Sequence, residues 1–123
     1  MMKWINDLWP LPRSLTGKGT IDTLNYLKDI NPELNIQSFK SGESVFDWRV
    51  PDEWNIKDAY IEHESGKRFA EFSENNLHLV GYSIPCNLTL NLDELLGHIH
   101  SLPEQPDVIP YVTSYYKDEW GFC

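Results

Sequence analysis

The sequence predicts an α+β fold with N-terminal helices, a small and mainly antiparallel β-rich region, and one further helix. Apolar residues recur at helical spacing near residues 3–9, 20–30 and 91–100. Between residues 34 and 84 the spacing changes to alternation, which is typical of strands with one buried face. The chain has 123 residues, of which 41% are hydrophobic, so it is long and apolar enough to bury a core.

Two helices are predicted in the first part of the chain. The first covers residues 3–9 and ends at Pro10, which removes a backbone donor. After a glycine-rich loop, Thr20 is the expected N-cap of the second helix, because its hydroxyl can accept a free backbone N–H. This helix ends before Pro32, and its apolar positions are Ile21, Leu24, Leu27 and Ile30.

Turn residues divide the middle of the chain into strands. Residues 59–63 form one predicted strand, and Ser65 with Gly66 forms the hairpin turn that follows it. Two longer apolar runs, 77–84 and 108–116, are also predicted as strands. Residues 45–50 should form a strand with one apolar face, made of Phe46, Trp48 and Val50.

The clearest local signal is a capping box before the third helix. Asn91 can accept the backbone N–H of Glu94, while the Glu94 carboxylate reaches back to the Asn91 N–H. A helix over residues 91–100 follows from this signal and from the apolar spacing behind it.

Charge and composition exclude several classes of protein. Ten Lys and Arg residues against nineteen Asp and Glu residues give a net charge of −9, and the cations are scattered. Since affinity for phosphate backbones comes largely from clustered cations, we expect no binding to nucleic acid. No apolar run is long enough for a signal peptide or a membrane span, and Cys86 and Cys123 lack metal or disulfide spacing. We therefore expect a cytoplasmic protein without membrane contact.

The histidines do not form a predicted metal site. His98 and His100 are two positions apart, so on a helix their side chains would point about 200° from each other. The helical zinc motif needs a spacing of four. His63 and His78 each lie alone in a predicted strand, where hydrogen-bonded histidines are far more common than ligands. We assign this chain no metal ligand, no bound cofactor and no catalytic residue.

Other candidate sites are equally weak. Residues 17–20 precede a helix but lack the spacing of a phosphate-binding loop, and no serine lies in a G-x-S-x-G elbow. Cys86 follows a proline in a loop and is expected to be a packed thiol. Aromatic side chains could line a sugar or peptide groove, although core packing explains most of them. They are Trp48, Trp54, Tyr60, Tyr82, Tyr111, Tyr115, Tyr116 and Trp120.

Aromatic residues continue to the last positions of the chain. Residues 111–123 include Tyr115, Trp120 and Phe122, whose burial requires a surface to pack against. We expect this segment to pack poorly in isolation and to be completed by a downstream catalytic domain or by another copy of the chain. The alternative is that Trp120 and Phe122 fold back onto the core of their own domain.

Several ordered blocks of the sequence resemble one known family. The blocks are residues 9–17, 45–56, 80–85, 100–103, 111–116 and 120–123. Together they resemble the start of the bacterial zinc aminopeptidase-like proteins, which are often labelled polysaccharide-biosynthesis proteins with an aminopeptidase-like domain. The resemblance covers essentially the whole chain.

The resemblance implies a division of the chain into three parts. Residues 1–38 would begin the α/β aminopeptidase-like domain, residues 39–105 would form a β-rich inserted domain, and residues 106–123 would return to the first domain. Zinc is implied for the full-length protein, with ligands that lie beyond this chain, so the chain alone should be inactive. The competing hypothesis is a self-contained module that binds a peptide, a glycan or another protein.

Overall fold

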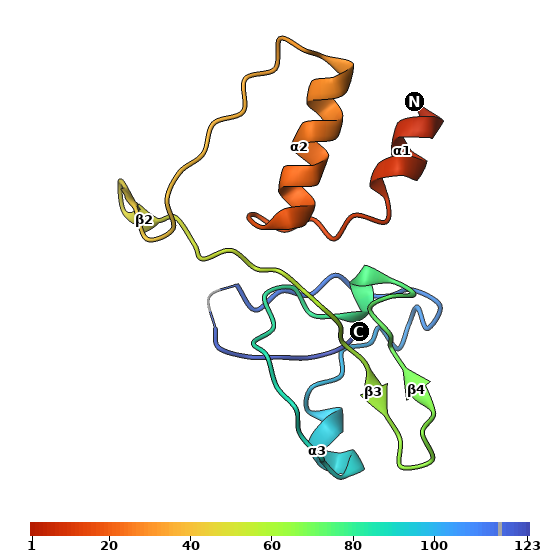
Figure 1. Cartoon of the computed structure of the whole chain (residues 1–123). Coiled ribbons are helices and arrows are strands. Elements are labelled where there is room, and N and C mark those ends of the chain that lie inside the picture. Colours follow the sequence, from red (N-terminus) through yellow and green to blue (C-terminus); the bar gives the residue numbers. More distant parts are fainter. Residues whose placement is uncertain (116) are drawn as a thin grey trace. The chain divides into compact units, whose positions relative to one another are not determined.

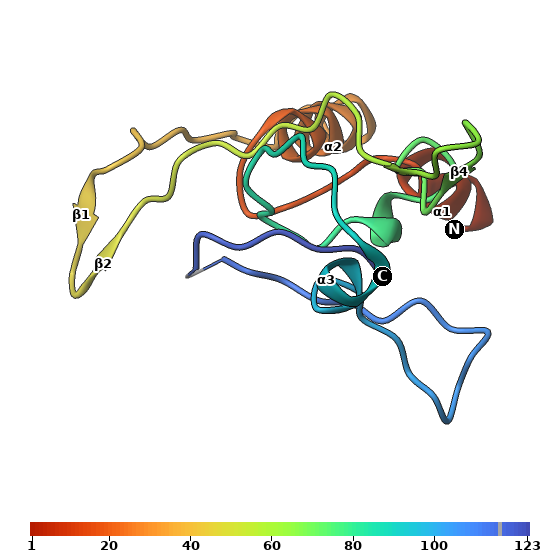
Figure 2. The ribbon, with the colours of Figure 1, turned by 90° about the horizontal axis from the view of Figure 1, so that it is seen from below.

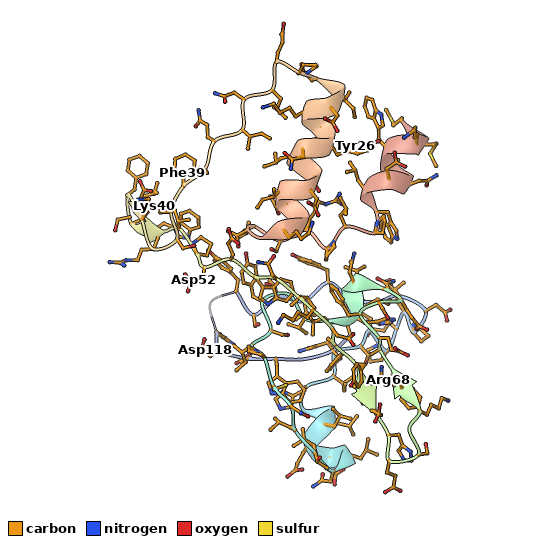
Figure 3. The ribbon with its side chains drawn as sticks, viewed as in Figure 1. Tyr26, Phe39, Lys40, Asp52, Arg68 and Asp118 are labelled. Atoms are coloured by element: carbon orange, nitrogen blue, oxygen red, sulfur yellow. The ribbon has the colours of Figure 1, made fainter. Side chains whose placement is uncertain are left out.

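Two helices, α1 (Met2–Leu8) and α2 (Lys18–Ile30), begin the chain close to the predicted positions (Figure 1). The computed structural model describes residues 1–115 and 117–123, and the chain forms two units, Met1–Ile56 and Lys57–Cys123. In the first unit, Tyr26 lies on the side of α2 that faces α1 (Figure 3) and donates its hydroxyl to Asp7 at 2.6 Å. Asp7 also pairs with Lys3 at 2.5 Å.

The start of α2 differs from the prediction. The helix begins at Lys18 with Gly17 as its N-cap, so the prediction of Thr20 as the cap is wrong. The Thr20 hydroxyl instead donates to the carbonyl of Ser14 at 2.6 Å. The side-chain oxygen of Asn55 accepts the backbone N–H of Lys18 at 2.7 Å, and this distant residue takes over the capping role.

The predicted strand at residues 45–50 is also wrong. Residues 44–49 form a tight antiparallel hairpin of β1 (Ser44–Val45) and β2 (Trp48–Arg49), in which Val45 pairs with Trp48. Phe46 therefore lies in the turn, with a φ of 54° that a bulky side chain rarely adopts. Figure 2 shows this hairpin at the end of two extended segments that lead away from α2.

The second unit begins with a hairpin that the sequence predicts correctly. Strands β3 (Ile61–Glu62) and β4 (Arg68–Phe69) are antiparallel, and the turn between them contains Gly66 with a φ of 82°. The guanidinium of Arg68 pairs with Glu62 at 2.9 Å and lies 3.7 Å from the centre of the Tyr60 ring. These exposed contacts brace the hairpin across its two strands.

The two longer predicted strands are replaced by shorter contacts. Residues 77–84 do not form a strand: a 3-10 helix, η1 (Asn76–His78), is followed by isolated bridges from Leu79 to Phe122 and from Gly81 to Thr113. Over 108–116 the bridge at Thr113 replaces the predicted strand, and Tyr116 lies outside the described residues. These segments therefore pair at single points and not along one ladder.

The third helix confirms the capping box but is shorter than predicted. Helix α3 (Leu92–Leu96) has reciprocal 3.0 Å bonds between Asn91 and Glu94. It ends at Leu96, so the prediction that it reaches residue 100 is wrong. The backbone N–H groups of the following residues bond to the last carbonyls of the helix, and residues 98–100 then pair with the end of the chain.

A buried core is present in the second unit. Val80 is 3% exposed and Phe122 is 8% exposed, and two hydrogen-bonded serines, Ser83 and Ser114, are buried beside them. The prediction that residues 111–123 pack poorly is thus wrong for Phe122, because its ring lies among residues of its own unit. Tyr111 is 77% exposed and fits the prediction better.

The first unit contains no buried hydrophobic side chain, and all of its residues are described. Its two buried residues are Gly17 and Gly19.

The whole chain has 9857 Å² of accessible surface. A compact monomer of this mass would expose about 6,800 Å², and two separate bodies of these sizes about 8,200 Å². The chain therefore leaves more surface in water than either arrangement would.

The structure confirms the α+β fold class, with helices and small antiparallel sheets. None of the helices within residues 1–115 and 117–123 combines the length and apolar character that a membrane crossing needs. The predicted three-part division at residues 38 and 105 stays a prediction.

Candidate functional site

The first unit contains a pocket of about 450 Å³ between the start of α2 and the segment after the hairpin. Gly17 makes this close approach possible, because a Cβ there would lie 2.4 Å from the Trp54 carbonyl oxygen. Gly19 allows the loop before α2 to approach in the same way, since its Cβ would lie 2.2 Å from the Pro12 carbonyl oxygen. The Thr16 hydroxyl and the Lys18 N–H bond to Asp52 and Asn55 at 3.0 and 2.7 Å. The lining residues are Pro12, Lys18, Gly19, Ile21, Asp22, Glu53, Trp54, Asn55 and Ile56.

Apolar and charged groups share this pocket. Lys18 pairs with Asp22 at 2.5 Å, and the Asn55 amide reaches the Glu53 carboxylate at 3.5 Å. The charged groups are therefore mostly paired, and Ile21, Ile56 and Trp54 are the less polar members of the lining. No nucleophile lies next to a base among the lining residues. This arrangement can bind a side chain or a small molecule.

In the second unit, three histidines surround the last residues of the chain. The Nδ1 atom of His98 donates to the Trp120 carbonyl at 3.0 Å, and that of His78 donates to the Cys123 carbonyl at 2.9 Å. A Cβ on Gly121 would lie 3.3 Å from His100 Nε2 and 2.8 Å from the His98 carbonyl oxygen. Residues 120–123 are thus held by side chains and by backbone bonds from both sides.

The His98 ring stacks on the Trp120 indole at 3.8 Å between centroids, with only 10° between the planes. Neither His98 nor His100 lies on α3, which ends before them, so the argument from their helical spacing does not apply. The sequence-based expectation of a hydrogen-bonded role fits His78, although this residue lies in η1 and not in a strand. His63, on the surface after β3, bonds to Ser65 at 2.9 Å.

The two cysteines have different surroundings but the same chemical tendency. Cys86 is exposed, so the expectation of a packed thiol is wrong, and Cys123 is half-buried. Partial burial raises the pKa of both thiols above the ordinary value. A raised pKa lowers the thiolate fraction at neutral pH, which disfavours either cysteine as a nucleophile.

Candidate metal ligands do not gather among the described residues. Within residues 1–115 and 117–123, no three His, Cys, Asp or Glu side chains come together at ligand distance. The side chains of His78 and His98 contact residues 120–123, but both histidines use Nδ1 to hold carbonyl groups there. Whether this chain contributes to a metal site stays a prediction.

Sequence reasoning missed the pocket because its walls come from residues 37 positions apart. The only local signal was the break at residues 51–55, where a polar run follows Pro51. Of the aromatic residues that were candidates for a groove, Trp48 and Trp54 belong to the first unit and the other described ones to the second. None of the seven that are described is fully buried, and Tyr82 packs edge-on against Tyr115 at 4.9 Å.

Comparisons with known proteins connect this fold to longer chains. A family model described as Domain of unknown function (DUF2172) matches residues 53–123. A protein of Clostridium acetobutylicum with the provisional name of polysaccharide biosynthesis protein with aminopeptidase-like domain is 49% identical over 118 residues, which are 96% of this chain and 27% of that protein.

A solved structure also matches this chain over part of a longer protein. A crystal structure from Clostridium acetobutylicum, described provisionally as that of a peptidase, matches with a TM-score of 0.94 and 48% identity. The match covers 98% of this chain and 28% of the other. The chain thus spans just over a quarter of the length of the relatives it matches.

Proposed function

This chain belongs to the family described as Domain of unknown function (DUF2172), and from that premise we propose that it is the N-terminal, non-catalytic part of a longer zinc-dependent aminopeptidase. The names of its relatives refer to an aminopeptidase-like domain and a peptidase, and this chain matches 27% and 28% of their lengths. The longer protein would remove N-terminal residues from peptides. This chain would complete the fold of that longer protein.

One observation carries the proposal: the first unit has helices with an apolar face but no buried apolar side chain. In α1, Trp4 is 47% exposed and Ile5 is 49% exposed, and in α2, Leu27 and Ile30 are 37% and 43% exposed. Each such side chain gains about 1.5–3 kcal/mol when it is fully buried. An exposed apolar face on two neighbouring helices is typical of a docking surface. We propose a downstream catalytic domain as the partner that covers it.

The extent of the family match supports the same proposal. The DUF2172 match begins at residue 53, so it includes the whole second unit but only the last four residues of the first. The similarity to the longer relative extends over 96% of the chain and therefore includes most of the first unit. We infer that the first unit belongs structurally with the remainder of the longer protein.

Zinc would supply an activated water and polarise the scissile carbonyl in such an enzyme. We assign its ligands to the remainder of the longer protein, and the lack of a group of three candidate ligands among the described residues supports this assignment. This chain would act by packing, with its first unit covering apolar surface of the catalytic domain. His78 and His98 would fix the backbone of residues 120–123 through their bonds to its carbonyl groups.

A chimera tests the proposal. The segment of the Clostridium acetobutylicum protein that matches this chain is replaced by this chain, and hydrolysis of leucine p-nitroanilide is measured with and without a chelator. We expect the chimera to keep zinc-dependent activity, the version without the segment to lose it, and the isolated chain to have none. Zinc-dependent activity in the isolated chain, or its absence from the intact relative, would refute the proposal.

The second unit favours an alternative function because it has its own core and lies entirely inside the family match. A module of this kind could bind a peptide, a glycan or another protein through exposed side chains such as Tyr111 and Phe69. A binding screen with residues 57–123 tests this alternative. Saturable binding of one peptide or glycan class, weakened by Tyr111→Ala, would support it.

A further inference from the structure

We draw no further inference here: the strongest candidate, the pocket of the first unit beside the start of α2, belongs to the candidate site already described, and nothing in the structure shows which ligand or partner occupies it.

Discussion

The two units of the chain differ in where their apolar side chains lie, although their lengths are similar. In the second unit, Val80 and Phe122 are almost fully buried, and segments far apart in the sequence meet around them. In the first unit, Trp4 and Trp9 on or next to α1 are 47% and 64% exposed. The difference teaches that an amphipathic pattern predicts a helix but does not say whether the same chain supplies the surface that covers it.

The two units also differ in the kind of contact that holds their segments together. The first unit depends on polar contacts between its segments, such as the Asn55 cap on α2 and the bond between Tyr26 and Asp7. The second unit adds backbone bonds and a buried ring to its polar contacts. Polar contacts at exposed positions contribute little net stability, so the first unit should be the less stable of the two.

The largest expected effect comes from Phe122→Ala in the second unit. Removal of a buried phenylalanine ring destabilises a protein by about 3–5 kcal/mol, which is comparable to the total stability of a domain of this size. We expect the amides of residues 77–82 and 119–123 to lose protection from hydrogen exchange, while α2 keeps its protection. Tyr111→Ala, at a side chain that is 77% exposed, is the matched control and should change stability by less than about 0.5 kcal/mol. A loss below about 1 kcal/mol for Phe122→Ala would contradict the assigned core.

Gly121→Ala should have the next largest effect. The added Cβ would lie 2.8 Å from the His98 carbonyl oxygen and 3.1 Å from Val80 Cγ2, so the closed end of the chain would have to move. We expect a loss of about 1–3 kcal/mol in urea denaturation. Gly97→Ala serves as the control, because the nearest atom to its added Cβ is 3.3 Å away. Equal stability of the two variants would show that residues 120–123 are not packed as tightly as described.

A smaller effect is expected from Asn55→Ala in the first unit. This change removes the acceptor for the Lys18 N–H and should cost about 0.5–2 kcal/mol of helix stability. Hydrogen exchange at Lys18 should quicken, whereas Asn55→Asp keeps an acceptor and should retain protection. Asn91→Ala is the local counterpart in α3 and should not alter exchange in α2. Unchanged hydrogen exchange at Lys18 in Asn55→Ala would contradict the capping of α2 by Asn55.

The smallest effect is the pH dependence of the contact between α1 and α2. The Lys3 ammonium and the Tyr26 hydroxyl hold the pKa of Asp7 below its ordinary value of 3.8, and the bond to Asp7 raises the pKa of Tyr26 above 10.0. The Asp7 contribution is thus present above pH 3.8 and is lost as the pH falls through its lower folded pKa. The Tyr26 contribution is present below pH 10.0 and is lost as the pH rises through its higher folded pKa.

NMR titration of the Asp7 carboxyl measures this contact. Tyr26→Phe should move the pKa of Asp7 upward, and Lys3→Gln should move it further, because the bond from Lys3 is the larger cause. All three groups are exposed, so added salt should reduce both shifts. A pKa of Asp7 that is the same in the unchanged chain and in both variants would contradict the described contact.

Local chemistry made some elements predictable. The capping box at Asn91 and Glu94, the turn at Gly66 and the helical spacing in residues 20–30 each depend on neighbours within a few positions. The strands predicted at residues 45–50 and 77–84 failed for the opposite reason. Alternating apolar residues do not distinguish a strand from a tight turn or from an extended segment that pairs at single points.

The sequence by itself determined the α+β class, the three helices and the β3–β4 hairpin, because all of these depend on residue types at short separations. Only the tertiary structure decided where Phe122 lies, which residue caps α2, and that Phe46 forms an exposed tip. These features depend on contacts between residues tens of positions apart, such as Lys18 with Asn55 and His78 with Cys123. No local pattern records which distant segment will meet a given residue, since that choice is made by the packing of the folded units as a whole.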